Sequence, residues 1–299
     1  MRSKFNWEVW VFILPTCLLL LAFLVWPTMQ TIYYSFFKGN FLDPTVEFWG
    51  LGHYDRLFTG DRQFLWLNRW PPSGALINTI IWIIFLPTFT VIFGLIVAIL
   101  ADGKKYETFF KSIIFIPMAI SATAASIIFR FIYNNDADTG ALNALLVFLL
   151  PEFEPVAWLG KKQPANFAII FAAVWIWTGL AMTILSAAYK ALPQEIIEAA
   201  IIDGATPWQR FWRLVLPMLS IPITFLVVVM IINALKMIDL VYVMTMGGPR
   251  GSTRVIGYSV YIEMFANAKI GYGSAIGAIL LILIIPIIYY QVMQSKKQL

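Results

Sequence analysis

Charged side chains that could do chemistry are sparse in this chain, and one group of them lies in the passage EAAIIDGATPWQRFWRLVLP at positions 198–217. Glu195 and Glu198 border an apolar ridge with the spacing of a helix face, which consists of Ile196, Ile197, Ala200 and Ile201. Such a ridge suits two roles: packing against the chain's own helices, or insertion into a groove on a soluble partner. The chemistry expected here is therefore recognition of a surface.

Turn and cap signals define the elements of this passage. Pro193 can occupy a first helical position and Gly204 suits the left-handed conformation that follows a helix, so a helix is predicted over 193–203. Thr206 and Gln209 then fit a capping box, which predicts a second helix immediately afterwards. The apolar face of this second helix consists of Trp208, Phe211, Trp212 and Val215. We expect it to lie at the membrane interface.

The sequence shows no constellation typical of a catalytic or metal site. With one cysteine, Cys17, and one histidine, His53, the chain can form neither an internal disulfide framework nor a four-ligand Cys/His zinc site. The glycine–lysine runs at 103–105 and 160–162 lack the upstream glycine and the hydroxyl residue of a phosphate-binding loop. We therefore expect no enzyme activity, metal or cofactor on this chain, and we interpret His53 as a surface or packing residue.

Composition places the chain in the membrane. Hydrophobic residues make up 60% of it and charged residues 12%, with a mean hydropathy of +0.79, whereas soluble domains average about 25% charged residues. The net charge of +5 comes from basic residues scattered between apolar runs, so nucleic-acid binding is not expected.

A helix needs about 20 apolar residues to cross a bilayer. Six stretches without Asp, Glu, Lys or Arg meet or approach that length: Val9–Phe37, Ala75–Ala101, Ser112–Phe129, Gln163–Tyr189, Leu214–Leu235 and Ile270–Ser295. Six crossings are therefore predicted, and the shorter apolar run Leu142–Leu150 is interpreted as a surface or re-entrant helix. Lys and Arg are about twice as dense in the loops that lie on the side of the termini, which predicts both termini in the cytoplasm.

The chain is expected to divide into three parts. Residues 1–74 hold the first crossing and an extracytoplasmic loop, 75–295 form the main transmembrane domain with a cytoplasmic loop at 190–213, and 296–299 form a short cytoplasmic tail.

The two apolar stretches that flank the 198–217 passage contain polar and aromatic residues at membrane depth. The first holds Trp175, Trp177 and Thr178, and the second holds Asn233, with Lys236 and Asp239 at its border. Polar groups are costly in hydrocarbon, so they indicate function. A hydrogen-bonding group beside an aromatic face suits a sugar, while interfacial anchoring or packing is the other interpretation of the tryptophans.

The 198–217 passage resembles the E-A-A motif of permease subunits of ATP-binding-cassette importers. In this family the motif lies in a cytoplasmic loop that couples the permease to its ATPase, and we call the passage the coupling loop. Its motif residues here are Glu198, Ala199, Ala200, Asp203, Gly204, Leu214, Leu216 and Pro217. The flanks KALPQEIIEAAIIDGATPWQRFWRLVLPML and MTMGGP (Met244–Pro249) are similar to the carbohydrate-uptake branch, of the maltose-system type. The resemblance covers the chain from about Asn78 to Tyr290.

The resemblance implies an all-α, polytopic membrane bundle with the type I importer permease fold and six transmembrane helices. It implies a second permease subunit, usually a different chain, two copies of an ATPase subunit that bind ATP and Mg²⁺, and an extracytoplasmic solute-binding protein. The helix within 193–204 would be the coupling helix that sits in a cleft of the ATPase. The location implied is a bacterial inner membrane, with the lipid bilayer around the bundle.

The resemblance also implies where solute would pass. The sugar-contacting positions of this branch fall near Ala173, Ile176, Trp177, Leu180, Met230, Asn233, Ala234 and Met237. From these we take Trp177, Asn233, Leu180, Met230 and Met237 as candidates, and we rank Trp177 and Asn233 first because they keep sugar-binding chemistry. The other positions are mostly apolar, so recognition of solute could instead lie with the partner subunit and the binding protein.

Two other classes of protein remain as alternatives. A secondary transporter or channel working alone would be expected to carry intramembrane charges or inverted repeats, and the six apolar stretches contain no charged residue. A membrane-embedded enzyme would need a catalytic cluster. Among importer solutes, a disaccharide, an oligosaccharide, a small glycoside and glycerol phosphate all remain open.

Overall fold

The computed structural model describes residues 7–40, 43–68 and 71–296. The chain divides into two compact units: Met1–Asp61 with Ser259–Leu283, and Arg62–Tyr258 with Ile284–Leu299. The last helix therefore contributes its first part to one unit and its end to the other. The predicted tail at 296–299 lies, apart from Lys296, outside the described residues.

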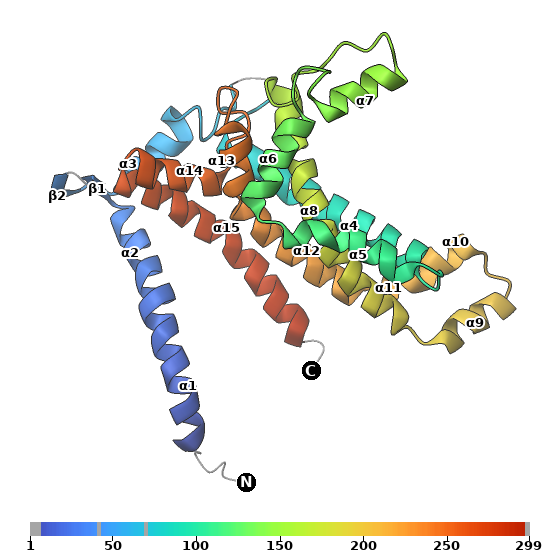
Figure 1. The fold of residues 1–299 in the computed structure, drawn as a ribbon. Helices are drawn as coiled ribbons and strands as arrows, with labels where there is room; N and C mark the ends of the chain where they lie inside the picture. Colours follow the sequence, from blue (N-terminus) through green and yellow to red (C-terminus); the bar gives the residue numbers. More distant parts are fainter. Residues whose placement is uncertain (1–6, 41–42, 69–70, 297–299) are drawn as a thin grey trace. The chain divides into compact units, whose positions relative to one another are not determined.

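The first unit contains a long apolar helical rod and a small cap. Its elements along the chain are α1 (Trp7–Leu20), η1 (Leu21–Val25), α2 (Trp26–Tyr34), β1 (Phe37–Asn40), β2 (Asp43–Phe48), α3 (Gly52–Asp55) and η2 (Arg56–Gly60), followed by the end of α14 (Ile256–Tyr261), then η4 (Ile262–Ala266) and the first part of α15 (Ile270–Lys296). Here η denotes a π-helical turn. Figure 1 labels the helices and strands.

Residues 11–34 form the first membrane span, and none of its most apolar window is buried. Phe12 and Phe23 are 82% and 77% exposed. A helix that is apolar all round and leaves nearly all of its surface exposed needs lipid or another protein around it. The span ends before its predicted limit of Phe37, because Phe37 pairs with Phe48 in the antiparallel β1–β2 hairpin.

The cap of the first unit is fastened by polar contacts. The Tyr272 hydroxyl donates a hydrogen bond of 2.5 Å to Asp61, and His53 Nε2 lies 3.0 Å from the Phe37 carbonyl. His53 is buried beside the Trp49 ring, and this burial lowers the pKa of its imidazole below the usual 6.5. His53 is thus a packing residue, as predicted.

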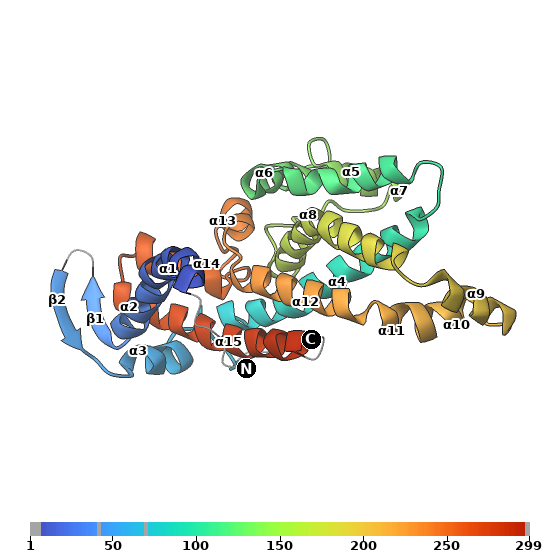
Figure 2. The same ribbon diagram turned by 90° about the horizontal axis from the view of Figure 1, so that it is seen from below.

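The second unit is a helical bundle with a long loop at each end (Figures 1 and 2). Its elements are α4 (Ala75–Ala101), α5 (Glu107–Ala119), α6 (Ala122–Ile132), α7 (Ala141–Leu149), α8 (Lys162–Lys190), α9 (Gln194–Ile202), α10 (Pro207–Arg210), η3 (Phe211–Val215), α11 (Leu216–Met218), α12 (Ser220–Leu235) and α13 (Asp239–Thr245), with the end of α15. The most extensive contacts join α4 to α8, followed by α4 to α12 and α5 to α8.

Glycines let α8 approach its two neighbours closely. A Cβ built on Gly94 of α4 would lie 2.6 Å from the Ala181 Cβ, and one built on Gly179 would lie 2.7 Å from the Ile114 carbonyl oxygen of α5. Small residues at such contacts are typical of helix packing in membranes. A buried hydrogen bond of 2.9 Å from the Trp82 indole to Asn166 adds a polar link between α4 and α8.

Four described helices are long and apolar enough to span a membrane, and the number is six when each of two bent helix pairs is taken as one span. This agrees with the six predicted crossings. The third and fifth crossings, however, are not the straight helices that an uninterrupted apolar run predicts: α5 meets α6 at 103°, and the α10–α11 segment meets α12 at 66°.

Both bends have local causes. Pro117 lies in the last turn of α5, and Ser121 restarts the helix as an N-cap by accepting a 3.2 Å hydrogen bond from the Ala124 amide. In the fifth crossing the break falls at Leu219, where Pro222 has no N–H to bond to the Met218 carbonyl and its ring crowds that carbonyl, so the helical hydrogen-bond ladder is interrupted. The short helix α7 appears where the run Leu142–Leu150 predicts one.

Candidate functional site

The short helix α9 leaves most of its apolar side chains exposed in the described part of the chain. It contains no buried residue, and Ile196, Ile201 and Ile202 are 42%, 52% and 86% exposed. Glu198 is exposed on the same helix. The ridge is divided between the two roles open to it: Ile197 packs against the chain's own bundle, whereas Ile196 and Ile201 stay exposed and are free to meet a partner. Figures 1 and 2 show α9 and α10 at one end of the second unit.

The helix α9 lies where the sequence predicts a helix, but it begins one residue later than predicted. Pro193 is the N-cap, with an extended ψ of 116°, and not the first helical residue as predicted. The shift arises because Leu192 is buried in the core and the helix begins only after it. Gly204 has φ +78° and no atom within 4 Å of an added Cβ, so it ends the helix through its backbone conformation, as expected.

The predicted capping box is present after this turn. The Thr206 amide donates a 2.9 Å hydrogen bond to Gln209 Oε1, and the Gln209 amide donates one of 3.3 Å to Thr206 Oγ1. Trp208 and Trp212 beyond it are 70% and 49% exposed and lie edge to face. Large exposed aromatic rings at the start of a span are typical of an interfacial segment.

Both ends of the coupling loop are anchored in one apolar cluster. The buried part of the cluster consists of Val91, Leu95, Ala98, Ala181, Leu185, Leu192, Val215, Leu219 and Leu226. Ile197 of α9 and Leu216 of the motif pack against it. Leu214 is half-buried, whereas Ala199, Asp203 and Pro217 are exposed and Ala200 is partly exposed. The loop is thus a projecting helix whose two ends are held by α4, α8 and α12.

A charged network that sequence reasoning missed lies where α8 leads into this loop. Lys190 Nζ is 2.6 Å from Glu107 and 3.8 Å from Asp102, and Glu107 also pairs with Lys111 at 2.5 Å. The Lys111 ammonium in turn donates to the Ser186 hydroxyl. Because Lys190 is 52% exposed, solvent screens its pairs with Glu107 and Asp102, and they contribute little to the stability of the fold. In the sequence, only the i,i+4 spacing of Glu107 and Lys111 indicated an ion pair of this network.

Four of the five solute candidates lie on two helices that touch each other, and Met237 follows the end of α12. Trp177 and Leu180 lie on α8 and Asn233 on α12, and all three are partly exposed. Met230 and Met237 are 0% and 8% exposed and are therefore covered by the chain's own packing. Trp175, by contrast, lies edge to face with Phe129 at 5.3 Å, which makes it a packing residue. Function at these positions stays a prediction.

Sequence reasoning also missed a mostly apolar cavity near the coupling loop, with polar side chains in part of its wall. It has a volume of about 630 Å³ and lies among α8, α12 and the end of α15. Its polar lining residues are Ser220, Thr224, Tyr290, Gln291 and Gln294. These side chains are spread over two distant stretches of sequence, so only the fold brings them together.

Within the described ranges, no group of three or more His, Cys, Asp and Glu side chains could hold a metal ion. The fold and the projecting loop define a class: a polytopic helical membrane protein with a helix free to bind a partner.

The chain belongs to the family of binding-protein-dependent transport system inner membrane components, whose model matches residues 90–298. It is 40% identical over 292 residues to the osmoprotective compounds uptake permease protein GgtC of Synechocystis sp., covering 96% of this chain and 99% of that protein. It is 33% identical to the alpha-glucoside transport system permease protein AglF of Rhizobium meliloti, covering 97% of this chain and 82% of that protein. Its fold is similar to a chain of a bacterial ABC transporter involved in the import of the acidic polysaccharide alginate, with a TM-score of 0.78, 20% identity and coverage of 98% and 96%.

Proposed function

We propose that this chain forms half of the translocation pathway of an ATP-driven importer for a sugar or sugar-like solute, a di- or oligosaccharide or a glycoside. Family membership supports the importer class, and the named uptake of osmoprotective compounds and alpha-glucosides by two relatives supports the solute class. A second permease, a different chain, supplies the other half. The complex lies in a bacterial inner membrane, with both termini of this chain in the cytoplasm.

The observation that carries the coupling part of the proposal is the exposed apolar face of α9. Ile201 and Ile202 enter a cleft of the ATPase, and Glu198 pairs with a basic residue at its rim. Because both ends of the loop are anchored in the cluster of α4, α8 and α12, motion of the ATPase moves these helices as a rigid body. ATP and Mg²⁺ bind only to the two ATPase subunits, and this chain catalyses no reaction.

The solute follows α8 and α12. Asn233 offers an amide and Trp177 an indole face, and both are partly exposed. Within the described chain the Asn233 amide has no hydrogen-bond partner, and a polar group at membrane depth without one is costly unless a ligand or another subunit supplies it. An extracytoplasmic binding protein delivers the solute to this pathway.

Replacing Trp177 by alanine is expected to lower kcat/KM for uptake by about tenfold, equivalent to about 1.4 kcal/mol, because the aromatic surface beside the solute is lost. Assembly with the ATPase should be unchanged. Thr178→Val is the matched control, since the Thr178 hydroxyl bonds to the Val174 carbonyl of its own helix at 2.6 Å. Uptake kinetics of the assembled complex provide the measurement, and equal uptake by wild type and Trp177→Ala for every transported solute would remove Trp177 from the pathway.

A further inference from the structure

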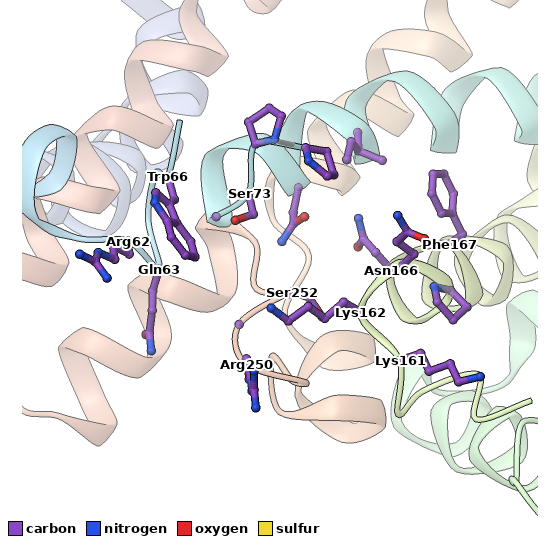
Figure 3. Close-up of a pocket in the computed structure, with 18 residues that line it drawn as sticks. Arg62, Gln63, Trp66, Ser73, Lys161, Lys162, Asn166, Phe167, Arg250 and Ser252 are labelled. Atoms are coloured by element: carbon purple, nitrogen blue, oxygen red, sulfur yellow. The ribbon is translucent and has the colours of Figure 1, made fainter. Parts of the chain in front are cut away.

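A second large pocket lies at the opposite end of the second unit from the coupling loop. It has a volume of about 730 Å³ and forms where α4 and α8 begin, beside the 62–74 segment and the 250–252 loop. In Figure 3 the rings of Trp66 and Phe167 lie on opposite sides of it, and the Lys162 side chain crosses toward the loop that carries Ser252. Because α4 and α8 are long membrane spans, this end of each helix lies at head-group level.

The charged residues that line the pocket are all basic. Its lining includes Arg62, Lys161, Lys162 and Arg250 and no acidic residue. In the part of the chain that the structure describes, none of these four cations has an ion-pair partner; Arg62 lies 5.5 Å from the Trp66 ring. In Figure 3 the Lys162 side chain reaches across the pocket, whereas those of Arg62, Lys161 and Arg250 extend outward from its edge. A pocket wall that carries only basic residues favours the binding of an anion.

Two further features of the pocket lining suit an anion. The Ser252 hydroxyl is buried and has no hydrogen-bond partner among the described residues, although Ser252 lines the cavity. In addition, α8 begins at Lys162 with an N-cap, Lys161, whose side chain makes no cap hydrogen bond. A buried hydroxyl and the positive end of a long helix both suit an oxyanion.

An apolar track leads from the pocket along the membrane span. Phe167, in the pocket wall, lies edge to face with Phe85 at 5.2 Å, and Phe85, Phe89 and Phe93 stack in turn along α4 at 5.7 and 6.0 Å. Phe89 and Phe93 are 37% and 38% exposed. A free soluble anion would use the cations alone, whereas an anion attached to hydrocarbon would use the cations and this track together.

We propose that this pocket binds one anionic phospholipid, with its phosphodiester at Lys162, the positive charges of Lys161, Arg62 and Arg250 around the rim, and an acyl chain along the phenylalanines of α4. The Ser252 hydroxyl donates a hydrogen bond to a phosphate oxygen. The site is separate from the coupling loop and from Trp177 and Asn233, and it makes lipid composition a determinant of the stability of this end of the bundle.

The test is native mass spectrometry of the purified full-length chain in detergent with equal amounts of phosphatidylglycerol and phosphatidylcholine. Wild type is expected to retain phosphatidylglycerol selectively. Because each surface cation contributes about 1 kcal/mol, or about fivefold, to binding of anionic lipid, the double variant Lys161→Gln/Lys162→Gln should lose about tenfold or more of that selectivity. The matched control is Lys104→Gln/Lys105→Gln, which removes the same charge from exposed positions in another loop and should retain it.

A second pair of variants tests the apolar track. Phe167→Ala should weaken retention of phosphatidylglycerol, whereas Phe171→Ala, 55% exposed one turn along the same helix, should not. Unchanged selectivity in the double lysine variant overturns the proposal. Binding of inorganic phosphate or glycerol phosphate as tight as that of the lipid overturns it in favour of a free anion. Loss of binding-protein-stimulated ATP hydrolysis, with lipid retention intact, would assign the cations to docking of the binding protein.

Discussion

Replacing Gly204 by valine is expected to abolish ATP-driven uptake while the membrane bundle stays folded. Gly204 has φ +78°, and an added Cβ would meet no atom within 4 Å, so the penalty is one of backbone conformation. Side chains in the left-handed region cost about 1–2 kcal/mol, and β-branched residues are outliers there. The turn between α9 and α10 would change direction, and α9 would no longer meet the ATPase. Measurement of ATPase retained on the tagged chain tests this.

Gly103→Val is the control for that experiment. Gly103 also has a positive φ, of +66°, and an added Cβ would again meet nothing within 4 Å. It therefore carries the same conformational penalty in a different turn, between α4 and α5. ATPase should remain bound to this variant. Equal retention of ATPase by Gly204→Val, Gly103→Val and wild type would contradict the assignment of α9 as the coupling helix.

Replacing Gly94 by leucine is expected to prevent normal packing of the bundle. An added Cβ at this position would lie 2.6 Å from the Ala181 Cβ and 2.8 Å from the Met182 amide nitrogen, both on α8. Overpacking of a tight contact costs about 1–3 kcal/mol and occasionally more, and the α4–α8 contact is the most extensive in the bundle. The yield of monodisperse protein and its thermal midpoint in detergent should both fall sharply.

Ile96→Ala provides the comparison within the same helix. Ile96 is 47% exposed and lies outside the apolar core cluster, so its truncation should remove little core packing. Its yield and thermal midpoint should stay close to those of wild type. A Gly94→Leu protein as stable as Ile96→Ala would show that α4 and α8 do not approach as closely as described.

Local signals predicted the coupling loop well. Gly204 and the Thr206–Gln209 capping box act over three or four residues, and the structure has both where the sequence places them. The number of crossings also followed from sequence, because bilayer thickness fixes the length of an apolar run. Pro193 shifted by one position because the burial of Leu192, a tertiary effect, decided where α9 begins.

Changes of helix direction and contacts between distant residues were not predicted. The bend after α5 has a local cause in the N-cap role of Ser121, but an apolar run gives no sign of a 103° change of direction. The network of Glu107 and Lys190 joins residues from separate helices. The basic pocket draws Arg62, Lys161 and Arg250 from three loops, which alone resemble ordinary surface charges.

Quantitative mass spectrometry of the tagged chain, purified from its own host in mild detergent, tests the central claim most directly. Two ATPase chains and one different permease per copy of this chain are the predicted result, together with solute uptake into vesicles that requires ATP and the binding protein. A chain that purifies alone, fully folded, and moves solute in vesicles without ATP would contradict the account and identify an independent transporter.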